Sequence, residues 1–401
     1  MLQSIVRIAL QWFRRLYVRV SLYAVIAFLA VFVSLWIGPY LPDTLVGFVD
    51  GTALRIILTT LGTSMLAVTT FSLSILASSY HFAASNISPR MEAVISADTT
   101  THSVLATFMG AFLFSLTGIM LLATPWVTEA TVFVLFGATL LVTAQVIVAM
   151  IRWINHIESL SGYRGAVSLL QKQALMPVRG YAASPALGCN QLEEASPLHH
   201  EAGYVIRADK DGYVQQILET ALQDQACDLQ VRIVCLVQPG DFVTRGSPLA
   251  RVLDTGVPED EEKKKDIRDR FLIRDGRTFL QDPEFGLSVL AEIGVRALSP
   301  GVNDPVTAVD IIHRLSAILQ RAAPQEGDPH DAIKNDRVWI APVPMDRLYR
   351  VSLETVARYV DAEPELQAAL ENAYGRLAKA CSVAGMQAAR DSAERLKISL
   401  S

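Results

Sequence analysis

Four long stretches without a charged residue constrain this chain more than any other feature of its sequence. They cover residues 20–41, 56–89, 103–124 and 131–151. A helix rises about 1.5 Å per residue and the hydrocarbon core of a bilayer is about 30 Å thick, so each stretch is long enough to span a membrane. The sequence therefore predicts four transmembrane helices. The second is too long for the bilayer and must tilt or project beyond the lipid.

Charged residues divide the chain into two parts. The first 160 residues hold 13 charged side chains, and the remaining 241 hold 62. This contrast predicts an α-helical membrane domain followed by a cytoplasmic α+β domain, which contains a small β-sandwich-like unit and a helical C-terminal part. We expect an interfacial amphipathic helix at 1–19, a four-helix transmembrane domain at 20–160, a connector at 161–202, a small β-rich unit at 203–256 and a mainly helical cytoplasmic domain at 257–401.

Positive charges near the four stretches predict the orientation in the membrane. The loops at 42–52 and 125–130 carry acidic residues but no Lys or Arg. Arginines lie instead before the first stretch, after the second and at the end of the fourth: Arg7, Arg14, Arg15, Arg19, Arg90, Arg152 and Arg164. Positive residues stay on the cytoplasmic side, so both termini should be cytoplasmic. Arg55 is the exception, and it either snorkels toward the interface or forms a functional ring at an outer mouth.

The first 19 residues form a lead with two different helical faces. Its arginines share one face and most of its apolar side chains share the other, which is typical of a helix lying in the plane of the membrane interface. A plain positively charged flank that sets the topology explains the same residues. The first apolar stretch is full length and follows this lead, unlike the short apolar core of a cleavable signal peptide.

Small and hydroxyl-bearing residues follow one face of the second stretch. They recur at steps of three or four residues, which keeps them on one helical stripe. The stripe consists of Thr59, Thr63, Ala67, Thr70, Ser74 and Ser78. Such a stripe either lets neighbouring helices approach closely or lines a wetted pathway in an oligomer. No acidic or basic residue lies within the spans, so any conduction would be passive.

Residues 203–253 predict a small β-rich unit. Short β-prone runs alternate there with turn signals such as Gln238-Pro239-Gly240-Asp241. This order is similar to the flattened β-sandwich of biotinyl and lipoyl carrier domains. Lys210 sits in a different turn from the modified lysine of those domains, so the resemblance implies a shape and no attached cofactor. Residues 176–200 are rich in Pro, Ser, Gly and His, which predicts a connector with few regular elements.

The most distinctive run of the chain covers residues 281–308. Asp304 is placed to cap a helix that has Pro305 at its first position, and Pro300-Gly301 makes the break before it. Arg296, at the end of the preceding helix, is able to reach Asp304 across the loop. Further along we expect one strand and three helices, at 338–345, 348–360, 364–380 and 385–396.

The run at 281–308, the four N-terminal spans and Ser88-Pro89-Arg90 after the second span together resemble the membrane-protein family called domain of unknown function 2254. The likeness extends over essentially the whole chain and implies a bacterial inner-membrane protein. It implies no activity, so no catalytic residue is carried over. Ser88-Pro89-Arg90 and Asn303-Asp304 would both be cytoplasmic. Arg90 could then pair with an acidic residue of the second half, or each motif merely ends its own helix.

No motif of an enzyme or of a metal site stands out. The chain has no P-loop, GxSxG or HExxH sequence, so we expect no enzyme. Its cysteines show no zinc-ligand spacing, and we expect buried thiols in a reducing compartment. They are Cys189, Cys227, Cys235 and Cys381. A net charge of −5 leaves no basic surplus to neutralise phosphates, which argues against a nucleic-acid-binding protein.

These features favour an oligomeric integral membrane protein that acts as a passive ion channel or pore, lined by the second span, with a cytoplasmic vestibule or gate. The alternative is a non-conducting membrane scaffold or sensor whose cytoplasmic domain recruits a partner. The expected partners are the lipid bilayer, further copies of the chain and ions, without a cofactor or a metal. The stripe should face a central axis in the first case and a helix of its own subunit in the second.

Overall fold

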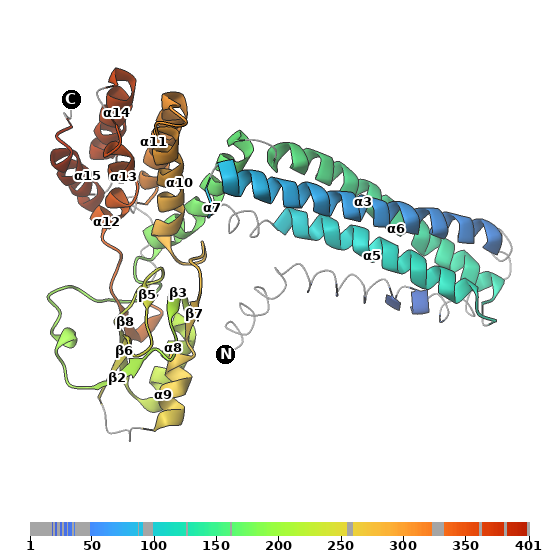
Figure 1. The fold of residues 1–401 in the computed structure, drawn as a ribbon. Coiled ribbons are helices and arrows are strands. Elements are labelled where there is room, and N and C mark those ends of the chain that lie inside the picture. The colour runs from blue at the N-terminus through green and yellow to red at the C-terminus, as the bar shows by residue number, and fades with distance from the viewer. Residues whose placement is uncertain are drawn as a thin grey trace. The chain divides into compact units, whose positions relative to one another are not determined.

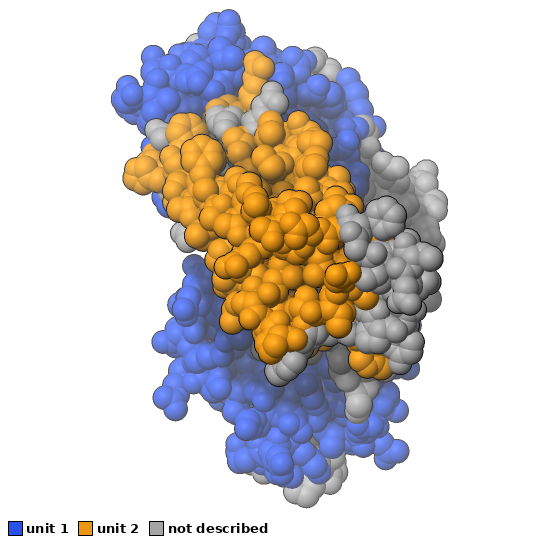
Figure 2. Space-filling view, turned by 90° about the vertical axis from the view of Figure 1, so that its right-hand side faces the viewer, with its two compact units in different colours: residues 1–4, 87–93, 167–401 blue, residues 5–86, 94–166 orange. Residues whose placement is uncertain are grey.

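The chain forms two compact units in a computed structural model (Figure 2). The structure describes residues 49–86, 88–90, 99–125, 127–160, 163–254, 260–322, 333–360, 363–380 and 383–398, with a few positions between 18 and 36. One unit, here the apolar unit, comprises residues 5–86 and 94–166. The other, here the α/β unit, comprises residues 1–4, 87–93 and 167–401.

Three long helices that pack side by side build the described part of the apolar unit (Figure 1). They are α3 (Gly51–Asn86), α5 (Thr99–Leu122) and α6 (Glu129–Leu160). Each contains a segment long and apolar enough to cross a membrane: Gly51–Phe82, Thr100–Leu122 and Glu129–Ile157. These segments coincide with three of the four predicted spans and confirm that those stretches are helices. The predicted first span and the lead at 1–19 fall almost entirely outside the described residues.

The second predicted span begins earlier than the charge pattern indicates. The backbone N–H of Thr52 donates to Asp50 Oδ1 at 3.0 Å, so Asp50 satisfies a free amide at the start of α3. Arg55 therefore lies inside the helix rather than before it. The apolar segment of α3 has 32 residues, or about 48 Å, which exceeds a hydrocarbon core of about 30 Å. The prediction that this helix is longer than the bilayer is thick is confirmed.

One face of α3 supplies the core of the apolar unit. Its buried positions recur at helical spacing: Leu54, Leu58, Gly62, Met65, Thr69, Ser72 and Leu76. They meet Phe108 and Phe114 of α5 and Leu135 and Trp153 of α6, all buried. Gly62 allows a close approach, because a Cβ atom there would lie 3.2 Å from the Cβ of Ser115.

Two sheets form the β part of the α/β unit (Figure 1). The five-stranded sheet has the order β1-β8-β4-β6-β2, with β1 (Cys189–Gln191), β8 (Asn335–Ile340), β4 (Arg232–Cys235), β6 (Pro248–Leu253) and β2 (Tyr204–Arg207). The three-stranded sheet has the order β5-β3-β7, with β5 (Phe242–Val243), β3 (Gly212–Ile217) and β7 (Phe271–Arg274). β8 runs parallel to β1 and β4, and the other pairs are antiparallel.

A single hydrophobic core joins the two sheets. It includes Ile206 and Ile233 from the larger sheet and Val214 and Ile273 from the smaller one, so the sheets form a sandwich. Leu222 of α8 (Glu219–Leu229) and Ile267 of α9 (Glu261–Arg268) add to the same core. A mixed helix and sheet architecture after the apolar helices is therefore confirmed.

The remaining helices of the α/β unit form a second packed group. They are α7 (Tyr163–Ala183), α10 (Pro283–Ala297), α11 (Pro305–Leu319), α12 (Met345–Arg350), α13 (Leu353–Ala357), α14 (Pro364–Ala380) and α15 (Val383–Arg395). Helix α10 packs against α11, α12 and α13, and α14 packs between α11 and α15. A short 3₁₀ helix, η3 (Pro197–His199), precedes β2.

Two predictions about this unit are wrong. Much of the predicted connector at 161–202 is the 21-residue helix α7, which contains Pro177. Its apolar face, with Val167, Leu170, Ala174 and Val178 fully buried, outweighs the helix-breaking tendency of one proline. The predicted β unit at 203–256 is also incomplete, because its sheets take β1, β7 and β8 from outside that range. Alternation along a strand predicts which face is buried and does not identify a distant partner.

Candidate functional site

All six positions of the hydroxyl stripe are exposed on α3. The stripe is Thr59, Thr63, Ala67, Thr70, Ser74 and Ser78, and each is exposed in the chain. It lies away from the face formed by Leu58, Met65 and Ser72, which is buried. The stripe is therefore not the surface through which α3 packs on α5 and α6. Its assignment as a pore lining stays a prediction.

Four hydroxyls of the stripe donate to their own helix. The Oγ1 atoms of Thr59, Thr63 and Thr70 lie 2.8, 2.9 and 2.9 Å from the carbonyl oxygens four residues earlier. Ser74 Oγ donates in the same way to the Thr70 oxygen at 3.1 Å. Each hydroxyl oxygen still has acceptor capacity directed away from the helix. These four hydroxyls can thus offer oxygen atoms to water or a cation while their own donors stay satisfied.

The outward surface of α6 has the opposite character. Its exposed side chains are large and apolar: Leu140, Leu141, Ile147, Val148, Ile151 and Ile154. Such a surface suits contact with lipid, whereas small and hydroxyl-bearing residues are typical of helix contacts in membranes. The exposed surface of α3 also carries large apolar side chains, such as Leu66 and Phe71, so the contrast with α6 holds for the stripe alone. Arg55, one turn before Thr59, is also exposed, and its role at an outer mouth stays a prediction.

Ser88 and Arg90 contact helix α10 inside the α/β unit. Ser88 is buried, and its hydroxyl donates to Glu292 Oε2 at 3.2 Å. Arg90 Nη1 forms an ion pair with the other oxygen, Glu292 Oε1. The backbone N–H of Arg90 donates to Ser88 Oγ at 3.2 Å. Arg90 thus pairs with an acidic residue of the second half, and we call Ser88, Pro89, Arg90 and Glu292 the Glu292 clasp.

Asp304 caps α11, as its position before Pro305 predicts. Its Oδ1 accepts from the backbone N–H of Thr307 at 3.0 Å, and its Oδ2 accepts from the Thr307 hydroxyl at 2.5 Å. These bonds hold the pKa of Asp304 below its usual value. Asn303 adopts a left-handed conformation with φ of 47°. Both carboxylate oxygens of Asp304 thus accept hydrogen bonds within the start of its own helix, and a contact with Arg296 stays a prediction.

A buried ion network lies at the start of α10. Asp282 accepts from the N–H groups of Glu284 and Phe285 at 3.0 and 3.1 Å and caps the helix. Arg277 binds the same carboxylate with two nitrogens, Nε at 2.7 Å and Nη2 at 2.8 Å. Only 1% of the Asp282 side chain is exposed. Bidentate pairing of this kind compensates for the cost of burying a carboxylate.

Arg347 of α12 extends this network to the β sandwich. Its Nε lies 2.6 Å from Glu284 Oε1, and its Nη2 lies 3.5 Å from Asp241 Oδ1 in the turn before β5. Its Nη1 donates to Gln238 Oε1 at 3.2 Å. Burial raises the pKa of Glu284 above its usual value, although Arg347 acts in the opposite direction. The network of Arg277, Asp282, Glu284, Arg347 and Asp241 therefore joins the sandwich, α10 and α12.

Gly240 shows how tightly this junction is packed. It has a φ of 99°, and a Cβ atom there would lie 2.5 Å from Asp282 Oδ2 and 2.9 Å from Arg277 Nη2. Only glycine meets both conditions without strain. The turn Gln238-Pro239-Gly240-Asp241 therefore also packs directly against the charged network.

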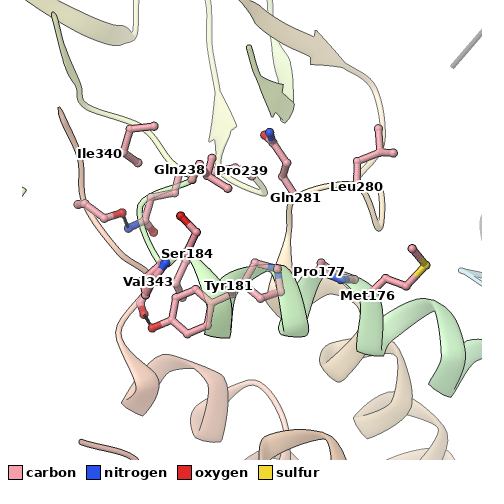
Figure 3. Close-up of a pocket in the computed structure, with 15 residues that line it drawn as sticks. Met176, Pro177, Tyr181, Ser184, Gln238, Pro239, Leu280, Gln281, Ile340 and Val343 are labelled. Atoms are coloured by element: carbon pink, nitrogen blue, oxygen red, sulfur yellow. Dashed lines mark hydrogen bonds between the residues drawn. The ribbon is translucent and has the colours of Figure 1, made fainter. Parts of the chain in front are cut away.

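A cavity of about 130 Å³ lies beside the network, between α7 and the turn at Gln238 (Figure 3). Figure 3 shows Tyr181 on the helix side and Gln238 across from it. The Tyr181 hydroxyl donates to the Val343 carbonyl at 2.6 Å, and Gln238 Nε2 donates to the Ala341 carbonyl at 3.0 Å. The rest of the wall is mostly apolar, with Pro177 among its members. These polar groups are therefore engaged with the chain itself.

The cysteines divide by location. Cys189 and Cys235 are buried in the sandwich core, and burial raises the pKa of the Cys189 thiol to about 12. Cys227 is exposed, so the prediction of a buried thiol is wrong there, because it lies on the outer side of α8. Cys381 lies outside the described residues. Within the described ranges, no group of three His, Cys, Asp or Glu side chains is placed to hold a metal ion.

Comparison with known families places the chain among predicted membrane proteins. The family described as "Predicted membrane protein (DUF2254)" matches residues 14–375. The chain belongs to this family. The family match includes α3, α5 and α6, the Glu292 clasp and the charged network, so these features lie within the part of the chain that defines the family.

Two relatives in this comparison come from mycobacteria. Uncharacterized proteins of Mycobacterium bovis and Mycobacterium tuberculosis are each 30% identical to the chain over 188 residues, which is 43% of this chain. The match covers 34% of each relative, so the chain spans about a third of the length of these proteins. No solved structure matches the chain.

Proposed function

We propose that this protein is an oligomeric membrane channel whose passive pore is lined by the hydroxyl stripe of α3. In this arrangement several copies turn the stripe toward a common axis, and the α/β units form a vestibule or gate. The lipid bilayer, further copies of the chain and the permeating ions are then its partners.

The exposure of the stripe is the observation that carries the proposal. All six positions are exposed in a single chain, although they belong to a helix whose opposite face is fully packed. Hydroxyl-bearing and small residues gain little from lipid and more from protein or water. A second copy or a wetted axis supplies that contact.

The chemistry of the stripe suits passive permeation. Its polar atoms are uncharged hydroxyls, which bind ions weakly enough to release them. The stripe contains no carboxylate or cation for coupling transport to proton movement. Such a lining is permissive, and the acidic loops at 42–52 and 125–130 would enrich cations only mildly at the outer side.

The same proposal includes the location. Arg90, Arg152 and Arg164 follow the spans on one side, which favours a bacterial inner membrane with both termini and the α/β unit in the cytoplasm. The proposal assigns no enzymatic reaction to the chain, whose sequence contains no P-loop, GxSxG or HExxH motif.

Ion flux across vesicles that contain the purified full-length chain tests the pore. Thr70→Leu and Ser74→Leu place bulky apolar groups on the stripe and should reduce flux without changing the particle mass in detergent. Ile57→Phe is the matched control, since Ile57 is 41% exposed and lies about 160° around α3 from Thr59. Unchanged flux in both stripe variants would refute the pore lining.

The second candidate function is a non-conducting scaffold or sensor. The apolar cavity between α7 and the turn at Gln238 favours it, because a cavity of this kind can receive a ligand or a partner's side chain. A wild-type protein that assembles in vesicles but passes no ions would support this alternative. A monomer in detergent and in vesicles would exclude the channel, because one stripe cannot enclose an axis.

A further inference from the structure

The cavity beside the charged network has a rigid wall. One face of α7 forms one side of it, and the turn before β5, the segment before α10 and the end of β8 form the other (Figure 3). Four of the lining residues are prolines: Pro177, Pro185, Pro239 and Pro283. Proline has a fixed φ and no N–H group, so this wall offers few backbone donors and changes little when a ligand binds.

Gly180 leaves the cavity open on the helix side. It lines the cavity from within α7, and a Cβ atom there would meet no described heavy atom within 4 Å. Its backbone is helical, so no unusual φ requires a glycine. Pro177, three residues earlier, is the residue type least tolerated inside a helix. Residues that weaken a helix where it borders a cavity are typical of a functional site.

Most polar side chains of the wall already have partners in the chain. Tyr181 and Gln238 donate to backbone carbonyls. Gln281 accepts from the Ile217 N–H at 2.8 Å and donates to the Ile217 carbonyl at 3.1 Å. Among the described residues that line the cavity, none is charged. An ionic ligand does not suit this wall, because its charge would be buried without compensation.

Ser184 is the polar residue with capacity to spare. Its Oγ accepts from the Gly188 N–H at 2.5 Å, and no hydrogen bond to another described residue uses its hydroxyl proton. Figure 3 shows this oxygen directed away from α7, toward Gln238 and Pro239. The Ser184 hydroxyl can therefore donate one hydrogen bond to a ligand.

The size and the entrance of the cavity suit a small ring. Its volume is about 130 Å³, and an apolar cavity of about 150 Å³ in another protein holds benzene. Met176 and Leu280 lie at the same end of the lining residues and are both exposed, so apolar side chains border the entrance (Figure 3). The proline rings and the ring of Tyr181 offer flat faces against which an aromatic ring packs.

We propose that this cavity is a binding site for a small, uncharged aromatic molecule of about the size of phenol. The ring lies against the proline wall, and the Ser184 hydroxyl donates to its oxygen. The site goes beyond the proposed channel and does not depend on conduction. A ligand there contacts α7, β8 and the turn that packs against the charged network, so it stabilises their arrangement.

Equilibrium dialysis of labelled phenol against the full-length protein in detergent, with protein-free micelles as the blank, tests the site. Wild type should bind one phenol per chain. Gly180→Leu fills the cavity and should weaken binding roughly tenfold or more. Gly375→Leu in α14 is the matched control, because its Cβ position is equally open and lies outside the cavity. Equal binding by wild type and Gly180→Leu, or an equal loss in both variants, would overturn the proposal.

Amide hydrogen exchange of the wild type uses no variant, so it stays decisive even where Gly180→Leu does not fold. Saturating phenol should slow exchange at 181–188 and 238–241 by roughly threefold or more, because the ligand stabilises the segments around it. Exchange in α14 should not change. Equal rates at 181–188 and 238–241 with and without phenol would overturn the site.

Ser184→Ala tests the hydrogen bond. The loss of one hydrogen bond should weaken phenol binding about threefold to tenfold. Toluene has no acceptor for the Ser184 hydroxyl, so its binding should stay as in wild type. An equal effect on the two ligands would overturn the role of Ser184.

Two further probes test other occupants. 1-Hexanol is a flexible chain of similar size, and tighter binding of it than of phenol would overturn the aromatic class in favour of an alkyl chain. N-acetyl-tyrosine amide carries the same ring on a peptide group. Its tighter binding would assign the cavity to a side chain of a partner protein and overturn the small-molecule ligand.

Flux measured on the same preparation separates this proposal from the channel. A protein that assembles without flux but binds phenol refutes the pore and supports the site. A protein that conducts but does not bind phenol supports the pore and overturns the site.

Discussion

Gly286 of α10 and Ala174 of α7 lie in direct contact, so that a Cβ atom added to Gly286 would come within 2.3 Å of the Ala174 Cβ and 2.5 Å of its Cα. Both neighbouring atoms are fixed by the helix backbone, so neither can rotate away. The contact holds α7, which follows the last apolar helix, against the helix that carries the Glu292 clasp.

Gly286→Ala should therefore destabilise the protein. Overpacking of this kind costs about 1–3 kcal/mol or more, because one of the two helices must shift. The thermal midpoint of the full-length protein in detergent should fall by several degrees. Gly375→Ala in α14 is the control, since nothing lies within 4 Å of a Cβ there, and this change should leave the midpoint unchanged or raise it. Equal midpoints for the two variants would contradict the close contact.

Two aspartates with the same local role should differ in their importance. Asp282 and Asp304 both cap a helix that has proline at its first position, but Asp282 is buried and also binds Arg277. Asp304→Ala should cost about 1 kcal/mol, the usual value of a cap. Asp282→Ala should cost more, about 3 kcal/mol, because it also removes the bidentate partner of a partly buried guanidinium and leaves Arg277 only Glu284 at 3.5 Å. Thermal unfolding of both variants measures the difference, and equal losses would show that Arg277 contributes nothing.

Glu284 should give the stability a dependence on pH. Burial raises the pKa of this carboxyl above its usual 4.5, so the folded state holds the proton more tightly than the unfolded state. The contribution of Glu284 to the free energy of unfolding is full below its pKa in the unfolded state. It is lost as the pH rises through its pKa in the folded state. Glu284→Gln does not titrate, so its thermal midpoint should fall less than that of wild type as the pH rises above 4.5.

Asp304 should give the stability a pH dependence of the opposite sign. Its pKa is lowered by the bonds from Thr307, so its contribution is present above its usual 3.8 and is lost as the pH falls below that value. Asp304→Asn should consequently change only the acid end of the profile. Parallel profiles for wild type and Glu284→Gln above pH 4.5 would contradict the raised pKa.

Ser72 and Ser115 make a matched pair inside the apolar unit. Both are fully buried, but Ser115 Oγ donates to the Ala111 carbonyl at 2.9 Å, whereas Ser72 Oγ has no hydrogen-bond partner among the described residues. A buried hydroxyl without a partner costs about 1–3 kcal/mol. Ser72→Ala should therefore raise the thermal midpoint, and Ser115→Ala should lower it. A loss of stability in Ser72→Ala would indicate a partner for that hydroxyl.

Local signals predicted some helices closely, missed α7, and did not predict the charged network. Helix α14 begins at Pro364 and ends at Ala380, at the predicted bounds, because proline at the start and a regular apolar face are local features. The network brings together three segments that are distant in the sequence, with Asp241, Arg277, Asp282 and Arg347. No spacing along the chain predicts these contacts. The Asp282-Pro283 pair repeats the cap signature of Asp304-Pro305, so the cap itself was predictable.

The sheet shows the same limit. β1 pairs with β8, and Cys189 lies opposite Asn335, which is far away in the sequence. Alternating hydrophobicity does not predict such a distant strand partner. Arg90 illustrates an intermediate case. Its place after an apolar span left an acidic partner in the second half as one of two alternatives, and the choice of Glu292 depended on which side of α10 faces Ser88.

The position of β8 in the sheet also bears on how the protein is made. Its residues 335–340 are synthesised after every other described strand, yet it lies between β1 and β4. Until these residues leave the ribosome, β4 keeps an open edge of the kind on which chains aggregate. A chain terminated before Asn335 loses an internal strand of the larger sheet rather than its rim. Such truncated products should be captured by chaperones or proteases soon after synthesis.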